Sequence, residues 1–169
     1  MIAKFSISFI FLFSSFIDAS SISTSLLNSE LKKNYSFLER SLSESEMKID
    51  TSSGKIFFTN EGISIHVLSP FEENYRINGD TMEIHDIFLD QTQSININEL
   101  DNFFLNILID GVDEDSDAYS INIINDSLIQ IIDNGSSNVI GFSFLENQLS
   151  LIRYQDSLGV EHGIELTPL

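Results

Sequence analysis

The three histidines are the side chains best suited to metal binding or proton transfer. His66, His85 and His162 fall in separate predicted strands, and no second histidine or carboxylate stands at the spacing of a metal site. We therefore predict no metal and no cofactor, with the histidines at the surface or rim of a sheet. His162 merits most attention, because it shares a period-two face with Val160 and Ile164.

Alternating acidic residues in the middle of the chain resemble the start of a calcium loop. Asp113, Asp115 and Asp117 have the spacing of its first ligands. However, Ala118 stands where a glycine must turn the loop, and Ile124 replaces the bidentate glutamate. We predict a solvated acidic loop over residues 111–117.

The sequence also lacks the motifs of nucleophilic catalysis. Residues 141–145 (Gly-Phe-Ser-Phe-Leu) begin like a nucleophile elbow, but the closing glycine is absent. The chain has no cysteine, which excludes thiolate nucleophiles and disulfides, and it has no glycine-rich phosphate loop. We expect a protein that is not an enzyme.

The charge balance restricts the partners. Eight basic residues stand against 26 acidic ones, for a net charge of −18. Nucleic acid is excluded as a partner because its phosphates must be met by clustered Lys and Arg. Peripheral binding to anionic lipid headgroups is excluded for the same reason.

The first residues have the pattern of an export signal. A short basic start at Lys4 is followed by an apolar run over residues 5–17, shorter than the ~20 residues of a membrane span. Ala19 offers a cleavage site, so we predict a signal peptide over residues 1–19 and a single mature domain over 20–169 in the periplasm. An uncleaved anchor is the alternative.

Elsewhere the chain is patterned mainly as strands. A short helix is predicted within residues 20–33, and one longer, largely buried helix over residues 96–110. Residues 52–54 and the pair Asn78-Gly79 are expected to turn the chain. The predicted strands cover residues 47–51, 55–59, 63–68, 75–77, 82–84, 119–123, 128–132, 140–144, 149–154 and 160–166. Such a chain forms a mainly antiparallel sheet that must curl.

The order of several segments resembles the periplasmic outer-membrane lipoprotein carrier family (LolA). These segments are residues 54–58 (Gly-Lys-Ile-Phe-Phe), 70–73 (Pro-Phe-Glu-Glu), the hairpin at Asn78-Gly79, the pair Asp90-Gln91 and residues 154–159 (Tyr-Gln-Asp-Ser-Leu-Gly). The resemblance implies an open, incomplete antiparallel β-barrel (a half-barrel) whose concave apolar face is covered by short α-helices. It also implies a carrier that receives lipid-modified proteins from an inner-membrane ABC transporter and delivers them to an outer-membrane receptor. We expect a monomer.

The chain departs from the family where a Lys-Arg-Pro segment is usual, because residues 59–61 are Thr-Asn-Glu. In the family this arginine bonds to the lid helices, so Asn60 is the candidate for a weaker lid latch; a simple turn residue is the alternative. The segment 62–70 is also one residue shorter than usual, and the chain ends before the family's last strand.

Apolar residues with a period of two are the candidates for an acyl-binding pocket, and the alternative is that they are simply core. The pocket candidates are Ile63, Ile65, Val67, Tyr75, Ile77, Met82, Ile84, Ile121, Ile123, Ile140, Phe142 and Phe144. The lid candidates are Leu27, Leu31, Phe103, Phe104, Ile107 and Leu108.

Two functions agree with this pattern. The first is a periplasmic carrier that shields the acyl chains of lipoproteins between the two membranes. The alternative is a LolA-like lipid- or protein-binding sensor or scaffold domain without carrier activity, because one fold supports several functions.

Overall fold

The computed structural model describes residues 22–43, 47–59, 61–100, 102–136 and 138–169. Two short α-helices, α1 (Thr24–Glu30) and α2 (Phe103–Asp110), and one 3-10 turn, η1 (Ile97–Glu99), accompany a large sheet. Its strands are β1 (Tyr35–Ser43), β2 (Lys48–Thr59), β3 (Gly62–Ser69), β4 (Glu73–Asn78), β5 (Thr81–Asp86), β6 (Gln91–Asn96), β7 (Tyr119–Asn125), β8 (Leu128–Asp133), β9 (Val139–Leu145), β10 (Gln148–Gln155) and β11 (Glu161–Pro168).

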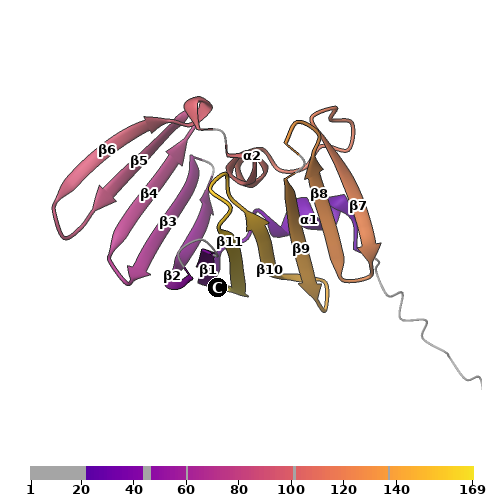
Figure 1. Cartoon of the computed structure of the whole chain (residues 1–169), viewed down its shortest axis with the longest axis horizontal. Helices are drawn as coiled ribbons and strands as arrows, with labels where there is room; N and C mark the ends of the chain where they lie inside the picture. The colour runs from indigo at the N-terminus through magenta and orange to yellow at the C-terminus, as the bar shows by residue number, and fades with distance from the viewer. Residues whose placement is uncertain (1–21, 44–46, 60, 101, 137) are drawn as a thin grey trace, which may run out of the picture.

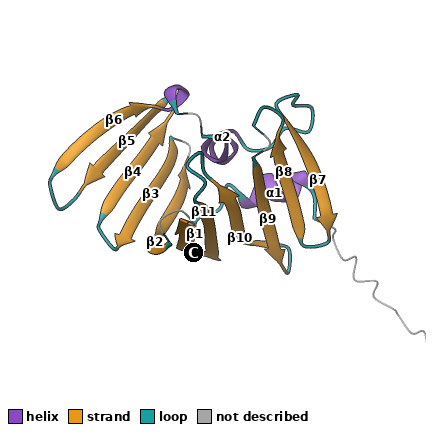
Figure 2. Ribbon diagram, viewed as in Figure 1, coloured by secondary structure: helices purple, strands orange, loops and turns teal. Residues whose placement is uncertain are grey.

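The sheet is an antiparallel meander joined at its centre. Its order is β6-β5-β4-β3-β2-β1-β11-β10-β9-β8-β7, so the first and last strands pair with each other. In the described part of the chain it stays open between β6 and β7, which confirms the predicted half-barrel. Figure 1 shows strands fanning out to either side of β1 and β11, with α2 between the two wings. Figure 2 shows how little helix accompanies them.

Both helices lie on one face of the sheet, which we call the inner face. The connection from β6 to β7 runs from one edge strand to the other, so it carries α2 across this face. Helix α1 reaches β10, where the Glu30 carboxylate accepts the Leu149 N–H at 3.1 Å. Within the described residues, no helix has the length and apolar character needed to cross a bilayer.

The predicted turn at residues 52–54 is wrong, because β2 continues through it to Thr59. Gly54 instead permits close packing: a Cβ there would lie 2.0 Å from the His66 carbonyl oxygen and 2.8 Å from the Phe37 ring. The hairpin predicted at Asn78-Gly79 is present, but its turn residues are Gly79, with φ +52°, and Asp80, since Asn78 pairs with Thr81.

The predicted helix over residues 96–110 is shorter than expected. Asn96 accepts the Asn98 N–H and caps η1, while Leu100 is extended. Asn102 then accepts the Leu105 N–H at 3.0 Å and begins α2. Asparagine side chains that cap a new turn compete with helix continuation, which explains the break.

Two strands were not predicted. On the inner face, the apolar alternation of β1 ends at Glu39, so its pattern is incomplete. Strand β6 (Gln-Thr-Gln-Ser-Ile-Asn) is mostly polar and exposed. Polar side chains are usual on an edge strand, where they discourage pairing with other chains.

Candidate functional site: an apolar cavity under α2

A cavity of about 490 Å³ lies between α2 and the inner face of the sheet. Helix α2 contributes Phe104, Leu105 and Leu108 to it. The apolar side chains that the sheet contributes are Phe37, Ile56, Ile65, Val67, Tyr75, Met82, Tyr154 and Ile164. A largely apolar concavity of this size fits a small apolar ligand or part of an acyl chain.

The strand register places all the predicted pocket residues on the inner face. In strands β3 to β5, Ile65 pairs with Tyr75 and Tyr75 with Ile84. In strands β7 to β9, Ile123 and Phe142 both pair with Ile129. Those that line the cavity are Ile65, Val67, Tyr75 and Met82. The neighbouring candidates do not line it: Ile63 and Ile77 are buried beside it, and Ile84 is half-buried.

The pocket candidates of β7 and β9 lie outside the cavity. Ile140, Phe142 and Phe144 are buried in closed core, because α1 packs on this half of the sheet with Leu27 fully buried. At the edge strand, Ile121 is half-buried and Ile123 is 55% exposed. The cavity therefore lies over β1 to β5 and β11, with Tyr154 of β10 at its border, and does not extend over β7 to β9.

The lid candidates divide between the two helices. In α2, Phe104 and Leu108 line the cavity, whereas Ile107 is buried and the Phe103 ring lies 6.0 Å from the Tyr119 ring. Leu27 and Leu31, in and just after α1, are buried in the core away from the cavity lining. Of the two α-helices in the described part of the chain, α2 is the one that covers the cavity.

A hydrogen-bonded pair ties the two helices together. Asn28 of α1 donates its side-chain amide to the Val112 carbonyl at 2.7 Å and accepts the Val112 N–H at 2.8 Å. Gly111 ends α2 with φ +77°, and a Cβ there would lie 2.8 Å from the Asn28 Oδ1. This bidentate contact holds the end of α2 against α1. The predicted latch residue, Asn60, lies outside the described residues.

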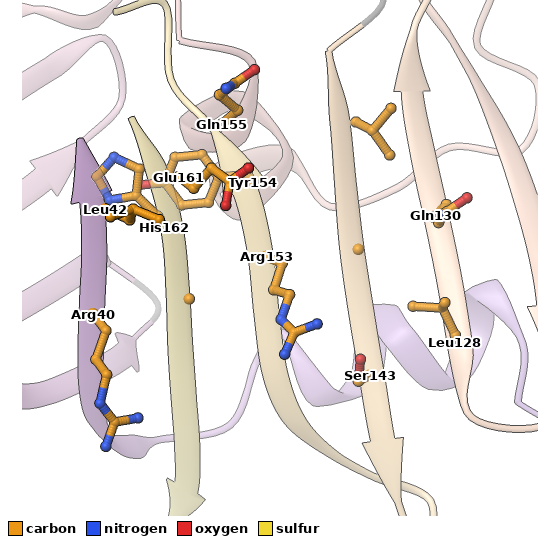
Figure 3. Close-up of a pocket in the computed structure, with 13 residues that line it drawn as sticks. Arg40, Leu42, Leu128, Gln130, Ser143, Arg153, Tyr154, Gln155, Glu161 and His162 are labelled. Carbon is orange, nitrogen blue, oxygen red and sulfur yellow. The ribbon is translucent and has the colours of Figure 1, made fainter. Parts of the chain in front are cut away.

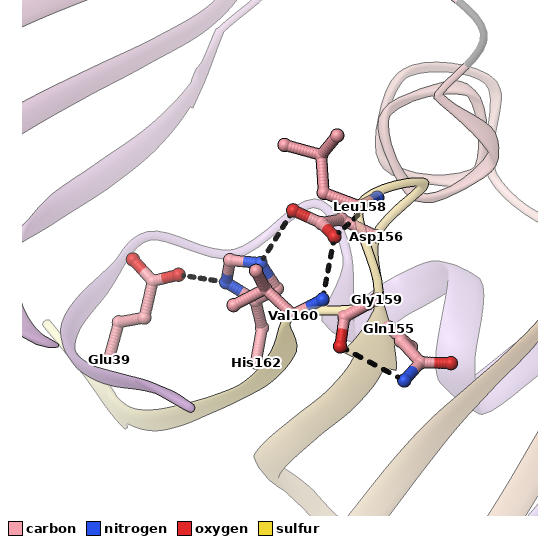
Figure 4. A network of polar contacts seen from close by, with 7 residues as sticks. All are labelled: Glu39, Gln155, Asp156, Leu158, Gly159, Val160 and His162. Atoms are coloured by element: carbon pink, nitrogen blue, oxygen red, sulfur yellow. Dashed lines mark hydrogen bonds and ion pairs between the residues drawn. The ribbon is translucent and has the colours of Figure 1, made fainter. Parts of the chain in front are cut away.

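A polar network borders the cavity (Figure 4). Glu39, which lines the cavity, contacts His162 Nδ1 at 2.7 Å and accepts the Ser52 hydroxyl at 2.8 Å. On its other side, His162 Nε2 lies 3.4 Å from Asp156. The hydrogen bond to Glu39 raises the pKa of His162; burial opposes this rise, and Asp156 adds to it. The same bond from His162 lowers the pKa of Glu39.

Aromatic stacking connects this network to α2. The Tyr154 ring stacks on the His162 ring with 4.6 Å between centroids, and on the Phe104 ring with 4.2 Å. Burial raises the pKa of the Tyr154 hydroxyl, so it stays neutral. One wall of the cavity is thus a stack running from a charged pair on the sheet to the covering helix.

The network does not form a hydrolytic triad. Ser52 donates to Glu39 rather than to His162, so the imidazole is not placed to remove its proton. Within the described part of the chain, no group of three His, Asp or Glu side chains is arranged to hold a metal ion.

Glu30 is buried at a second polar site, with 1% of its surface exposed. Burial raises its pKa, but hydrogen bonds from Lys33, the Leu149 N–H and Tyr35 outweigh burial and hold the pKa below its usual value. These contacts fix the end of α1 to β1 and β10, so we assign Glu30 a structural role.

The outer face of the sheet has a second cavity of about 600 Å³, lined by both charged and apolar side chains, which we call the outer groove (Figure 3). Arg153 lies between Gly141 and Gly163 in the strand register, and Arg40 follows beyond Gly163. Because the two glycines have no side chains, space remains on both sides of Arg153. Its arginines make this groove unsuitable for an uncharged acyl chain.

Several cavity residues were missed from the sequence. Phe37 and Glu39 belong to the unpredicted strand β1, although the alternation of Tyr35 and Phe37 was a usable signal. Leu105 and Tyr154 lie in predicted elements, but the sequence does not show which way their side chains point. For Leu105 this depends on where α2 begins, and for Tyr154 on the position of the bulge in β10.

A comparison with models of known protein families finds no match, and neither does a search of curated proteins. Among solved structures, a LolA superfamily protein from Nitrosomonas europaea has a similar fold, with a TM-score of 0.50 and 10% sequence identity. The similarity covers 85% of this chain and 90% of the other. At this identity it establishes the fold alone.

Proposed function

We propose that the protein is an exported periplasmic carrier that shields the acyl chains of lipid-modified proteins between the inner and the outer membrane. The observation that carries this proposal is the apolar cavity of about 490 Å³ between α2 and the inner face. The fold it shares with a LolA superfamily protein and the apolar leader over residues 5–17 support it. An inner-membrane ABC transporter and an outer-membrane receptor are the proposed partners.

The expected affinity suits a carrier that must also release its cargo. About ten buried CH₂ groups contribute ~8 kcal/mol, which corresponds to a micromolar dissociation constant before the costs of binding. A cavity of this size holds part of a set of acyl chains, so the protein binds its cargo without enclosing all of it.

Acyl binding is tested with a labelled triacylated lipopeptide and its non-acylated counterpart. Protein exported with its own leader and purified without detergent should co-elute with the acylated peptide alone. Ile65→Glu should weaken this complex at least ~10-fold, because it puts a charge into the apolar cavity. Ile123→Glu is the matched control: it makes the same change on the same face at an exposed edge, and should leave binding intact. Equal retention of both peptides would contradict the proposal.

A transfer assay separates the carrier from the sensor or scaffold. The preformed complex is mixed with outer-membrane vesicles, and the labelled cargo is followed by sedimentation. A carrier passes the cargo to the vesicles, whereas a sensor or scaffold domain binds it without handing it over.

A further inference from the structure

The charged side chains of the cavity all carry the same sign. Among the described residues that line it, Glu39 and Glu73 are ionisable acids, and no Lys, Arg or His accompanies them. The nearest arginine in sequence, Arg76, pairs with Glu83, whose side chain is half exposed, at 3.8 Å. A ligand in the cavity therefore meets two carboxylates and no cationic side chain among the described lining residues.

The two carboxylates are not equivalent. Glu39 contacts His162 at 2.7 Å, and the protonated imidazole balances its charge locally. Within the described residues, the hydrogen bond that Glu73 accepts comes from the neutral Tyr75 hydroxyl, at 2.5 Å, and Glu73 pairs with Asp86 in the β4–β5 register. The hydrogen bond fixes the Glu73 carboxylate without neutralising it. Glu73 is thus the unbalanced negative charge of the cavity.

Glu73 stands close to the opening of the cavity. Two residues before it in the chain, Phe71 also lines the cavity and is 75% exposed to solvent. The polar head of a ligand whose chain lies under α2 would remain near this opening, because only the apolar part gains from burial. The head group therefore lies within range of the Glu73 charge.

We propose that the cavity selects acyl ligands by head-group charge, favouring amine-bearing and uncharged heads over carboxylate or phosphate heads, with Glu73 as the selecting residue. The inference rests on the proposed acyl-binding function and names its ligand class. Acyl chains joined to a protein through amides or esters carry no charge at the junction, whereas free fatty acids and anionic phospholipids do. The net charge of −18 also disfavours ligands with anionic head groups, at longer range.

The experiment uses three ligands with the same chain: dodecylamine, dodecanamide and dodecanoate. Each displaces an uncharged fluorescent acyl probe from the exported protein at pH 7.5, below micelle formation. We expect the amine and the amide to bind more tightly than the carboxylate, by roughly tenfold for one unscreened charge near the head group. Glu73→Gln should narrow the ratio between amine and carboxylate several-fold and leave amide binding unchanged, which also shows that the variant is folded.

Glu161→Gln is the matched control, because it removes the same charge from an exposed side chain at the outer groove and should leave the ratio as it is. If dodecanoate binds as tightly as dodecylamine while dodecanamide also binds, head-group selection is wrong but the acyl-binding function stands. An unchanged ratio in Glu73→Gln, or an equal narrowing in Glu161→Gln, overturns the role of Glu73. If none of the three ligands binds, the acyl-binding function fails as well.

Discussion

The pair of Glu39 and His162 links the protonation of the imidazole to the aromatic wall of the cavity. Both side chains are partly buried, with 25% and 16% exposed. The imidazole stacks on Tyr154, which stacks on Phe104 of α2. Because protonated His162 has carboxylates at both ring nitrogens, its charge strengthens the contacts that hold this stack in place.

Stability should fall as the pH rises above neutrality. The pKa of His162 is higher in the folded protein than its ordinary value of about 6.5. The contribution of protonated His162 to the free energy of unfolding is therefore fully present below about pH 6.5 and is lost as the pH rises through the folded-state pKa. It amounts to ~1.4 kcal/mol for each pH unit by which the folded-state pKa exceeds the unfolded-state pKa. Urea unfolding between pH 6 and pH 9 measures this fall, which His162→Gln should flatten.

The control for this titration is His85→Gln, which removes a half-buried histidine whose partner, Asp90, is almost fully exposed. That variant should keep the fall in stability seen in the parent protein. A fall that persists undiminished in His162→Gln would show that the pair with Glu39 does not contribute.

Period-two alternation puts the pocket candidates on one face, because alternate residues of a strand point to the same side. It did not separate cavity from core. Ile65 and Phe142 have equivalent patterns, but Ile65 lies under α2 and Phe142 is fully buried in the half that α1 covers. That difference depends on contacts between distant segments. It also explains why Glu39 and His162, whose strands are separated by most of the chain, were not paired beforehand.

At the scale of elements, the cavity depends on how α2 is held. Asn102 caps its beginning, and Gly111 ends it beside Asn28. Of the side chains that α2 turns toward the cavity, Leu108 is buried, but Phe104 is only half-buried because the space beneath it is not filled by protein. The bond between Asn28 and Val112 compensates by fixing the end of α2 to α1.

Asn28→Ala should lower the free energy of unfolding by about 1–3 kcal/mol, because it removes two hydrogen bonds and leaves the buried Val112 backbone without this partner. Binding of a hydrophobic dye under native conditions should rise as α2 loosens. Ser29→Ala is the matched control in the same helix, since its hydroxyl bonds only locally to the Leu26 carbonyl. Equal losses in the two variants would contradict a tie between the helices.

The elements found from the sequence are those with clear apolar alternation and turn residues, such as β3, β4, β5 and β8 to β11. The errors have local causes. Gly54 looked like a turn residue but allows close packing against Phe37 and His66. Apolar spacing joined η1 and α2 into one predicted helix, whereas asparagine caps separate them.

At the scale of the whole molecule, the pairing of β1 with β11 determines the architecture. It joins two meanders at the centre of one sheet and places β6 and β7 at opposite edges. The segment between these edge strands must pass from one edge of the sheet to the other, and it does so over the inner face, where α2 covers the cavity. Local sequence patterns do not predict which distant strands pair. The resemblance to a half-barrel family is what predicts this architecture.

The central claim is that an acyl chain binds between α2 and the inner face, and photolabelling tests it most directly. An acyl probe with a diazirine at the end of its chain is irradiated with the exported protein, and the modified residues are located by peptide mass spectrometry. The account predicts adducts in α2 around Phe104–Leu108 and on inner-face residues such as Ile65 and Met82. Adducts concentrated around Arg153 in the outer groove, or spread over exposed turns, would contradict it.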